Sequence, residues 1–177
     1  MKKLILAAVV AVLAATAVSA TPRFGGTTKY NVGQGSRPAV GIALEEEMFN
    51  ATLTISNDKV TNVSFQSNQE TTDFGLTVAG NYKHQLGGGN TLLAGLGFTS
   101  TKNTTDLTGT ASDVELTSTG IEVNVGVQKE LSDNVLLTVE SPLVGIWTTK
   151  SDQANTEDQK STKIIDGVKV GFTFLIN

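Results

Sequence analysis

Hydrophobic and polar residues alternate along most of this chain. The clearest stretch is 120–149, in which Val123, Val125 and Val127 alternate with polar or small residues, and the alternation resumes after a Ser-Asp-Asn turn at 132–134. Successive side chains of a strand point to opposite faces, so this stretch predicts a hairpin with one aliphatic face and one polar, partly charged face. In strands this long, that division favours a barrel with lipid outside and polar side chains inside.

The alternation predicts eight antiparallel strands in chain order. They span 38–46, 47–56, 59–66, 73–85, 91–101, 114–129, 135–149 and 163–176. The connections after the second, fourth and sixth strands are short, whereas those after the third, fifth and seventh are polar and mostly longer, which is typical of outer-membrane barrels. The expected fold is all-β: an antiparallel, up-and-down, eight-stranded transmembrane β-barrel. A competing count takes 24–33 as the first strand and joins 38–56 into one.

Residues 1–20 differ from the rest of the chain. Lys2 and Lys3 precede an apolar run at 4–18, and small residues follow up to Ala20, which together predict a secretory signal peptide. Residues 21–37 are rich in Gly, Thr and polar residues and predict a flexible N-terminal segment with room for one short strand. The barrel is then expected to occupy 38–177, and export points to the bacterial outer membrane.

The composition excludes several kinds of binding partner and structural feature. Removing Lys2 and Lys3 with the signal peptide takes the formal net charge from −4 to −6, which disfavours nucleic acid as a partner. The chain has no Cys, so disulfides and thiolate metal sites are excluded. After the signal peptide, no apolar run approaches the length of a membrane helix, so a membrane assignment has to rest on strands.

The aromatic residues provide a separate test of that assignment. If the short connections face the periplasm, most aromatic residues fall on the outward face near a strand end. Amphipathic rings prefer the headgroup level of a bilayer, whereas a soluble barrel places large aromatics inward. A soluble exported barrel or sandwich remains the alternative. The predicted lipid-interface aromatics are Phe49, Phe65, Phe74, Tyr82, Phe98, Trp147, Phe172 and Phe174.

Four charged residues fall on the inward face, and they form the predicted interior network: Lys83, Glu122, Glu140 and Lys169. The rest of that face is small or polar, and an eight-stranded barrel has room only for packed side chains. Because buried charges need partners, Lys169 is expected to pair with Glu122, Glu140 or both, as the central cation of a plug. The alternative is that Lys169 extends to water inside a wet lumen.

These features resemble the small eight-stranded outer-membrane barrels, namely the transmembrane domain of OmpA, OmpX, Ail and the opacity proteins. The resemblance covers about 38–177 and lies in the strand pattern, which ends in the alternating stretch 170–177; its last aromatic residue is Phe174 and its last residue is Asn177. It implies a monomeric structural barrel, adhesin or narrow pore that sits in outer-membrane lipid and is inserted by the barrel-assembly machinery.

No catalytic, cofactor or metal site is predicted. The single histidine, His84, is expected to face outward at the low end of its strand, and neither Ser64 nor Ser67 is placed near it as a hydrolase would require. Two functions remain. A structural or adhesive barrel would present the polar loops 102–113 and 150–162 to a cell-surface or host ligand, and a transport barrel would pass ions or small solutes.

Overall fold

The structure is a computed structural model that describes residues 22–32, 38–63, 68–107, 114–152, 157–164 and 167–176. The predicted signal peptide and the predicted interface residue Phe65 lie outside these ranges. Within them, no helix is long and apolar enough to cross a membrane.

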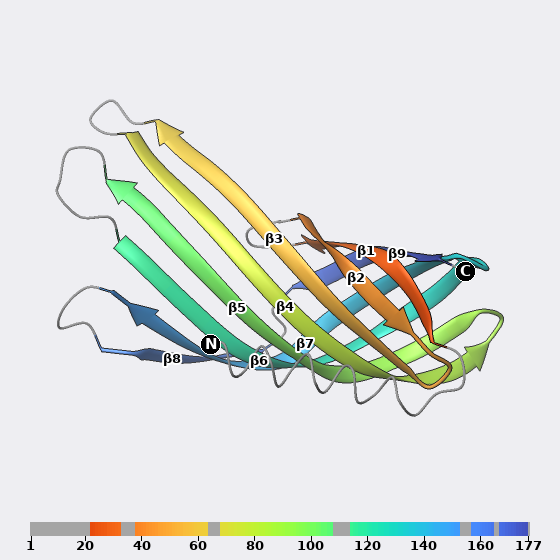
Figure 1. The fold of residues 1–177 in the computed structure, drawn as a ribbon. Helices are drawn as coiled ribbons and strands as arrows, with labels where there is room; N and C mark the ends of the chain where they lie inside the picture. The colour runs from red at the N-terminus through yellow and green to blue at the C-terminus, as the bar shows by residue number, and fades with distance from the viewer. Residues whose placement is uncertain are drawn as a thin grey trace.

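The described residues form one closed antiparallel barrel (Figure 1). Its strands are β1 (Arg23–Val32), β2 (Pro38–Glu45), β3 (Phe49–Val63), β4 (Asn68–Gly87), β5 (Asn90–Leu107), β6 (Val114–Ser132), β7 (Val135–Ser151), β8 (Gln159–Ile164) and β9 (Val168–Ile176). From β1 to β7, each strand pairs with the next. β7 then pairs with β8 along one part and with β9 along another, and β9 pairs back with β1. β8 and β9 therefore act as one barrel strand, and the predicted up-and-down, eight-stranded all-β barrel is confirmed.

The first barrel strand is β1, so the assignment of 21–37 as a flexible segment is wrong for its described part. Thr27 pairs with Gly41 of β2 on one side and with Thr173 of β9 on the other. Glycine and threonine fill the centre of β1, so it shows no aliphatic series, and only its two neighbours reveal it as a strand. The competing start at 24–33 is confirmed, but its single strand over 38–56 is broken by a turn in which the Glu46 N–H donates to the Phe49 carbonyl (2.9 Å).

The dipeptide Asn57 and Asp58 is not a turn. β3 runs through it to Val63, with Asn57 opposite Phe74 and Asp58 opposite Asp73 on β4. The predicted strands 47–56 and 59–66 are therefore one strand over its described length. Asn and Asp favour turns on local grounds, but both residues lie within the continuous pairing of β3 with β4, which overrides that preference.

The two faces of the barrel wall follow the predicted alternation. Many outward aliphatic side chains are strongly exposed, among them Val40 (62%), Ile42 (64%), Ile121 (58%), Leu96 (59%) and Ile176 (73%). The inward face is buried and mostly polar, including Thr52, Thr54, Asn81, Asn124, Gln128, Thr138 and Thr173. Such an arrangement is the inverse of a soluble barrel, in which apolar side chains fill the interior.

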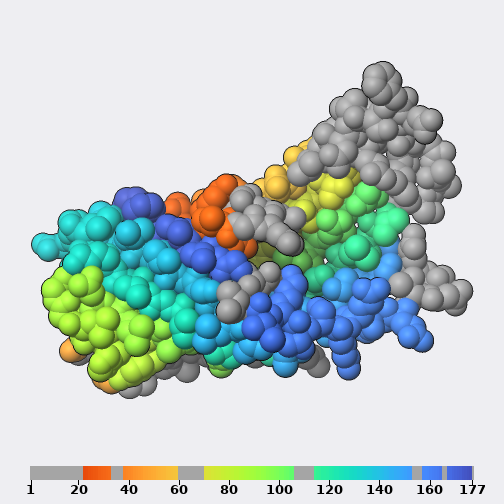
Figure 2. Space-filling view, turned by 180° about the vertical axis from the view of Figure 1, so that it is seen from behind, coloured from red at the N-terminus to blue at the C-terminus, as the bar shows by residue number. Residues whose placement is uncertain are grey.

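At the end opposite the short turns, β3–β8 continue beyond the closed part of the barrel. β3 pairs with β2 only as far as Ser56 and then with β4 alone, and within the described residues β8 pairs with β7 alone. The projecting strands extend to the left in Figure 1, and Figure 2 shows from behind that they reach past β1 and β9. The region is an open, curved sheet, which we call the projecting sheet; the end of the molecule that carries it is the long-strand end.

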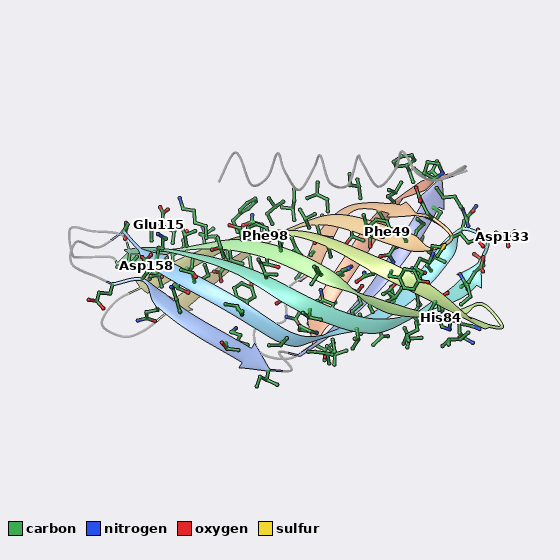
Figure 3. The ribbon with its side chains drawn as sticks, turned by 90° about the horizontal axis from the view of Figure 1, so that it is seen from below. Phe49, His84, Phe98, Glu115, Asp133 and Asp158 are labelled. Carbon is green, nitrogen blue, oxygen red and sulfur yellow. The ribbon has the colours of Figure 1, made fainter. Side chains whose placement is uncertain are left out.

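Part of each predicted loop belongs instead to the strands of the projecting sheet. Much of 102–113 lies in β5, and parts of 150–162 lie in β7 and β8. Residues 108–113 and 153–156 lie outside the described residues. Three exposed ion pairs link the sheet: Lys59 with Glu70 (2.6 Å), Lys102 with Glu115 (2.8 Å) and Lys150 with Asp158 (2.8 Å). Figure 3 shows Glu115 and Asp158 near this end, and His84 and Asp133 toward the short turns.

Candidate functional site

Within the part of the chain that the structure describes, three lysine–glutamate pairs occupy the barrel interior. Lys83 pairs with Glu45 at 2.8 Å, Lys29 with Glu140 at 2.8 Å, and Lys169 with Glu122 at 2.7 Å. All three glutamate side chains are about 5% exposed or less, while the lysine side chains range from 9% to 21%. Each carboxylate therefore has a cation beside it, as burial of a charge requires.

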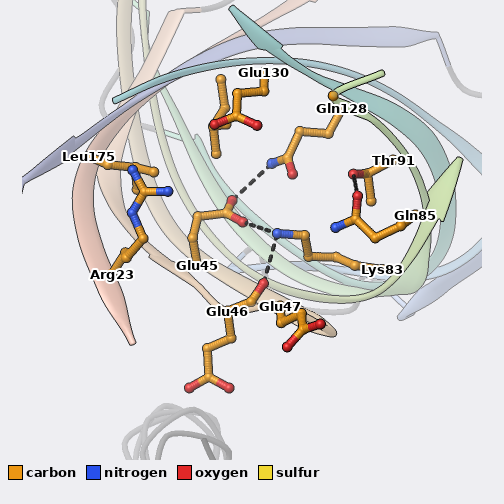
Figure 4. A pocket seen from close by; sticks show the side chains of 12 residues that line it. Arg23, Glu45, Glu46, Glu47, Lys83, Gln85, Thr91, Gln128, Glu130 and Leu175 are labelled. Atoms are coloured by element: carbon orange, nitrogen blue, oxygen red, sulfur yellow. Dashed lines mark hydrogen bonds and ion pairs between the residues drawn. The ribbon is translucent and has the colours of Figure 1, made fainter. Parts of the chain in front are cut away.

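The pair nearest the short turns joins β2 and β4. Glu45 accepts hydrogen bonds from Lys83 Nζ (2.8 Å) and from Gln128 Nε2 of β6 (2.9 Å). Lys83 Nζ also donates to the Glu46 carbonyl (2.8 Å), and Figure 4 shows Glu45 between its two donors. These groups line a cavity of about 270 Å³ at the short-turn mouth of the barrel. Glu45, the last residue of β2, thus supplies an interior carboxylate that the predicted interior network did not include.

The second pair joins strands from opposite ends of the chain. Lys29 Nζ of β1 donates to Glu140 Oε2 of β7 (2.8 Å) and to Thr52 Oγ1 (3.3 Å). The other oxygen of Glu140 accepts from Asn81 Nδ2 (3.0 Å), which also donates to Asn50 Oδ1 (3.0 Å). The predicted interior network omits Lys29 because residues 21–37 were expected to form a flexible segment. In the competing count, which begins with a strand at 24–33, Lys29 has inward parity.

The third pair contains the predicted central cation. Lys169 of β9 lies directly opposite Glu140 of β7, yet its Nζ bonds to Glu122 Oε2 of β6 (2.7 Å). Glu140 is taken by Lys29 instead. The four predicted residues Lys83, Glu122, Glu140 and Lys169 all face inward, but they belong to three separate pairs rather than to one plug.

Trp147 faces the interior, so its assignment to the lipid interface is wrong. Val123 lies opposite Val144, and the next residue of β6, Asn124, lies opposite Pro142, which leaves Leu143 without a partner. This β-bulge shifts the alternation of β7 by one residue. Beyond it, Trp147 lies opposite the inward Gly120 and shares its face. The prediction assumed uninterrupted alternation across Leu143 and therefore placed Trp147 on the outward face.

The other described aromatics of the predicted set lie on the outward face. Phe74, Tyr82, Phe172 and Phe174 are 47%, 52%, 40% and 52% exposed. Phe49 is half-buried opposite Tyr82, and Phe98 is half-buried opposite the exposed Ile121, and both pairs face outward.

His84 lies exposed on β4, opposite the outward Leu92. The serines weighed beside it, Ser64 and Ser67, lie outside the described residues. Over the part of the chain that the structure describes, no group of three or more His, Asp or Glu residues is arranged to hold a metal ion.

Comparison with known proteins identifies the fold of this chain. No protein-family model matches the chain, and no curated protein matches it in sequence. The chain has the fold of the small eight-stranded outer-membrane barrels. A major outer membrane protein from Thermus thermophilus is 10% identical, with a TM-score of 0.55 over 89% of this chain and 100% of that one. Neisserial surface protein A (14%, TM-score 0.50, 88% and 96%) and OprG from Pseudomonas aeruginosa (16%, TM-score 0.50, 88% and 94%) are similar as well.

Proposed function

We propose that this chain is an outer-membrane β-barrel with a structural or adhesive, non-enzymatic role, and that it acts by presenting the projecting sheet to a ligand outside the cell. The observation that carries the proposal is the continuation of β3–β8 beyond the closed barrel. A strand built only to cross a bilayer needs about 9–11 residues, whereas β4 has 20 and β6 has 19. The additional length places paired backbone and polar side chains in water.

The membrane position rests on the outward face. Exposed aliphatic side chains surround the closed part of the barrel, and the outward positions of β5 change from Phe98 to Ser100 and Lys102 where the projecting sheet begins. Burying this apolar belt in lipid removes it from water, and the polar residues above it remain hydrated. In this orientation the short turns face the periplasm and the projecting sheet is extracellular.

The interior supports a closed barrel rather than a pore. Each of the three ion pairs bridges two strands that flank a third inside the barrel, and side chains such as Leu93 and Asn81 are 1% exposed. An ion crossing the barrel would have to separate paired charges in a narrow, poorly solvated space. A narrow pore for ions or small solutes is the alternative, and it predicts measurable conductance of the wild-type protein in planar bilayers.

The test shortens one projecting hairpin while keeping its register. Residues 104–115 are replaced by a two-residue turn, so that Asn103 and Leu116 remain the last paired residues of β5 and β6. We expect bacteria that express the full chain to bind cultured epithelial cells or immobilised matrix proteins, and the shortened variant to lose this binding while remaining in the outer-membrane fraction. Glu130→Ala, at the opposite end of β6, is the matched control and should bind like the wild type.

Three results would contradict parts of this proposal. Recovery of the mature chain in the soluble periplasmic fraction would replace the membrane barrel with a soluble exported binding module. Channel activity of the wild-type protein would favour the pore. Equal binding by the full-length and shortened variants would show that this hairpin of the projecting sheet is not the adhesive surface.

A further inference from the structure

The only tryptophan of the chain lies against the inner wall of the barrel over two glycines. A Cβ added at Gly120 would lie 2.4 Å from Trp147 Cδ2, and one added at Gly145 would lie 2.9 Å from Trp147 Nε1. The indole ring therefore occupies the space that side chains at both positions would take. A larger residue at either position would push the ring away from the wall. The two glycines therefore form the surface on which the ring packs, which we call its seat.

The ring is adjacent to the third ion pair. Gly145 lies opposite Glu122, and a Cβ at Gly145 would also lie 3.3 Å from Glu122 Cγ. Gly120, the other part of the seat, is two residues from Glu122 along β6, toward the long-strand end. Trp147 thus lies between the pair of Lys169 with Glu122 and the open space enclosed by the projecting sheet.

A cation lies over the ring. Lys163 of β8 lies opposite Gly145, and its Nζ is 5.3 Å from the centre of the Trp147 ring, within the range of a cation–π contact. Within the described residues, β8 pairs only with β7, whereas most barrel strands have a partner on each side. The clamp is therefore carried by the strand with the fewest backbone hydrogen bonds to its neighbours.

We propose that Trp147 is a lid on the inner wall at the long-strand end of the barrel, and that Lys163 clamps it. The lid covers the pair of Lys169 with Glu122, and displacement of β8 releases it. This inference rests on the closed barrel proposed above and adds a conformational device to it, because a ligand that moves β8 changes access to the interior.

The test uses the absence of cysteine from the chain. Asn124→Cys introduces one thiol at an inward position that is 4% exposed and lies below the lid on β6. Its rate of modification by a small, water-soluble methanethiosulfonate is measured in the refolded full-length barrel. If the open form is a minor state of about 0.1–10%, adding Trp147→Ala should accelerate modification by about 10- to 1,000-fold. Phe98→Ala, which removes an outward ring instead, should leave the rate unchanged.

A second variant tests the clamp without disturbing the barrel wall. Lys163→Gln should accelerate modification of the introduced thiol by about two- to fivefold, and Lys163→Arg should restore the slow rate because a guanidinium also binds a ring face. Only variants that show the heat-dependent gel mobility of a folded barrel are compared. A modification rate that does not depend on Trp147 and Lys163 would overturn the lid.

The location of the ring is tested separately. Acyl chains carrying bromine should not quench the fluorescence of Trp147, because the barrel wall separates the ring from lipid. Strong quenching by brominated lipid would place the ring outside and overturn the lid as well. Neither result affects the proposed function, which would fail by wild-type conductance or by loss of outer-membrane location.

Discussion

Lys29 on the first strand and Glu140 on the seventh are joined across the barrel interior by an ion pair of 2.8 Å. β9 lies between their strands in the barrel wall, so the pair bridges the seam at which the two ends of the chain meet. The N-terminal strand therefore contributes a buried charge and does more than complete the wall.

Loss of Lys29 should destabilise the barrel more than loss of the whole pair. Lys29→Met leaves Glu140 buried without its cation, and breaking a buried pair from one side costs about 3–5 kcal/mol. Lys29→Met combined with Glu140→Gln should recover a large part of that free energy of unfolding, because no isolated charge remains. Thermal unfolding in detergent measures both. Equal stability of the single and double variants would show that the two residues are not coupled.

Lys169 should be coupled to Glu122 and not to Glu140. Lys169→Met should lower the free energy of unfolding, and Glu122→Gln in the same chain should restore much of it. Glu140→Gln should not, since that change instead leaves Lys29 buried without its anion. A double-mutant cycle separates the two cases, with an expected coupling energy of about 0.5–3 kcal/mol for the true pair. Coupling to Glu140 alone would indicate that Lys169 pairs as its position on β9 suggests.

The aliphatic face of the hairpin β6–β7 should not tolerate charge. Val125 lies on the outward face near the middle of β6, and Val125→Arg should cost about 2–4 kcal/mol in a lipid bilayer. Thr119→Arg, on the same face nearer the projecting sheet, is the control and should cost about 0–1 kcal/mol. Urea unfolding in lipid vesicles measures the difference. If Val125→Arg is neutral while Asn124→Leu is damaging, the outward face is not in lipid.

Substitution by alanine should destabilise the barrel at Gly120 but not at Gly26, although both are glycines within strands. Gly120→Ala puts a methyl group 2.4 Å from the Trp147 ring and should cost about 1–3 kcal/mol by overpacking. It should also shift the fluorescence maximum of Trp147, because the ring must leave its seat. Gly26→Ala, which meets nothing within 4 Å, should change neither property. An unchanged spectrum in Gly120→Ala would show that the ring does not rest on Gly120.

The alternation of side chains by itself determined the class of fold, the position of most strands, and which face of each strand points outward. On β4, for example, the pattern assigns Leu76, Val78 and Tyr82 to one face. It assigns Thr77, Ala79 and Asn81 to the other face, and the structure has the same assignment. The reason is local. Side chains of a strand alternate every two residues, and in a membrane barrel the apolar set must face lipid while the polar set faces the interior.

Only the tertiary structure decided the first strand, the length of β3, the direction of Trp147 and the partner of each interior charge. β1 becomes a strand because it pairs with β2 and β9, and the Asn57–Asp58 stretch because it pairs with β4. Trp147 turns inward because one extra residue, Leu143, is inserted opposite β6. Lys169 reaches Glu122 because β9 and β6 flank β7 in the closed barrel, which brings them within reach inside it. These outcomes depend on register and closure, which no pattern within a single strand contains.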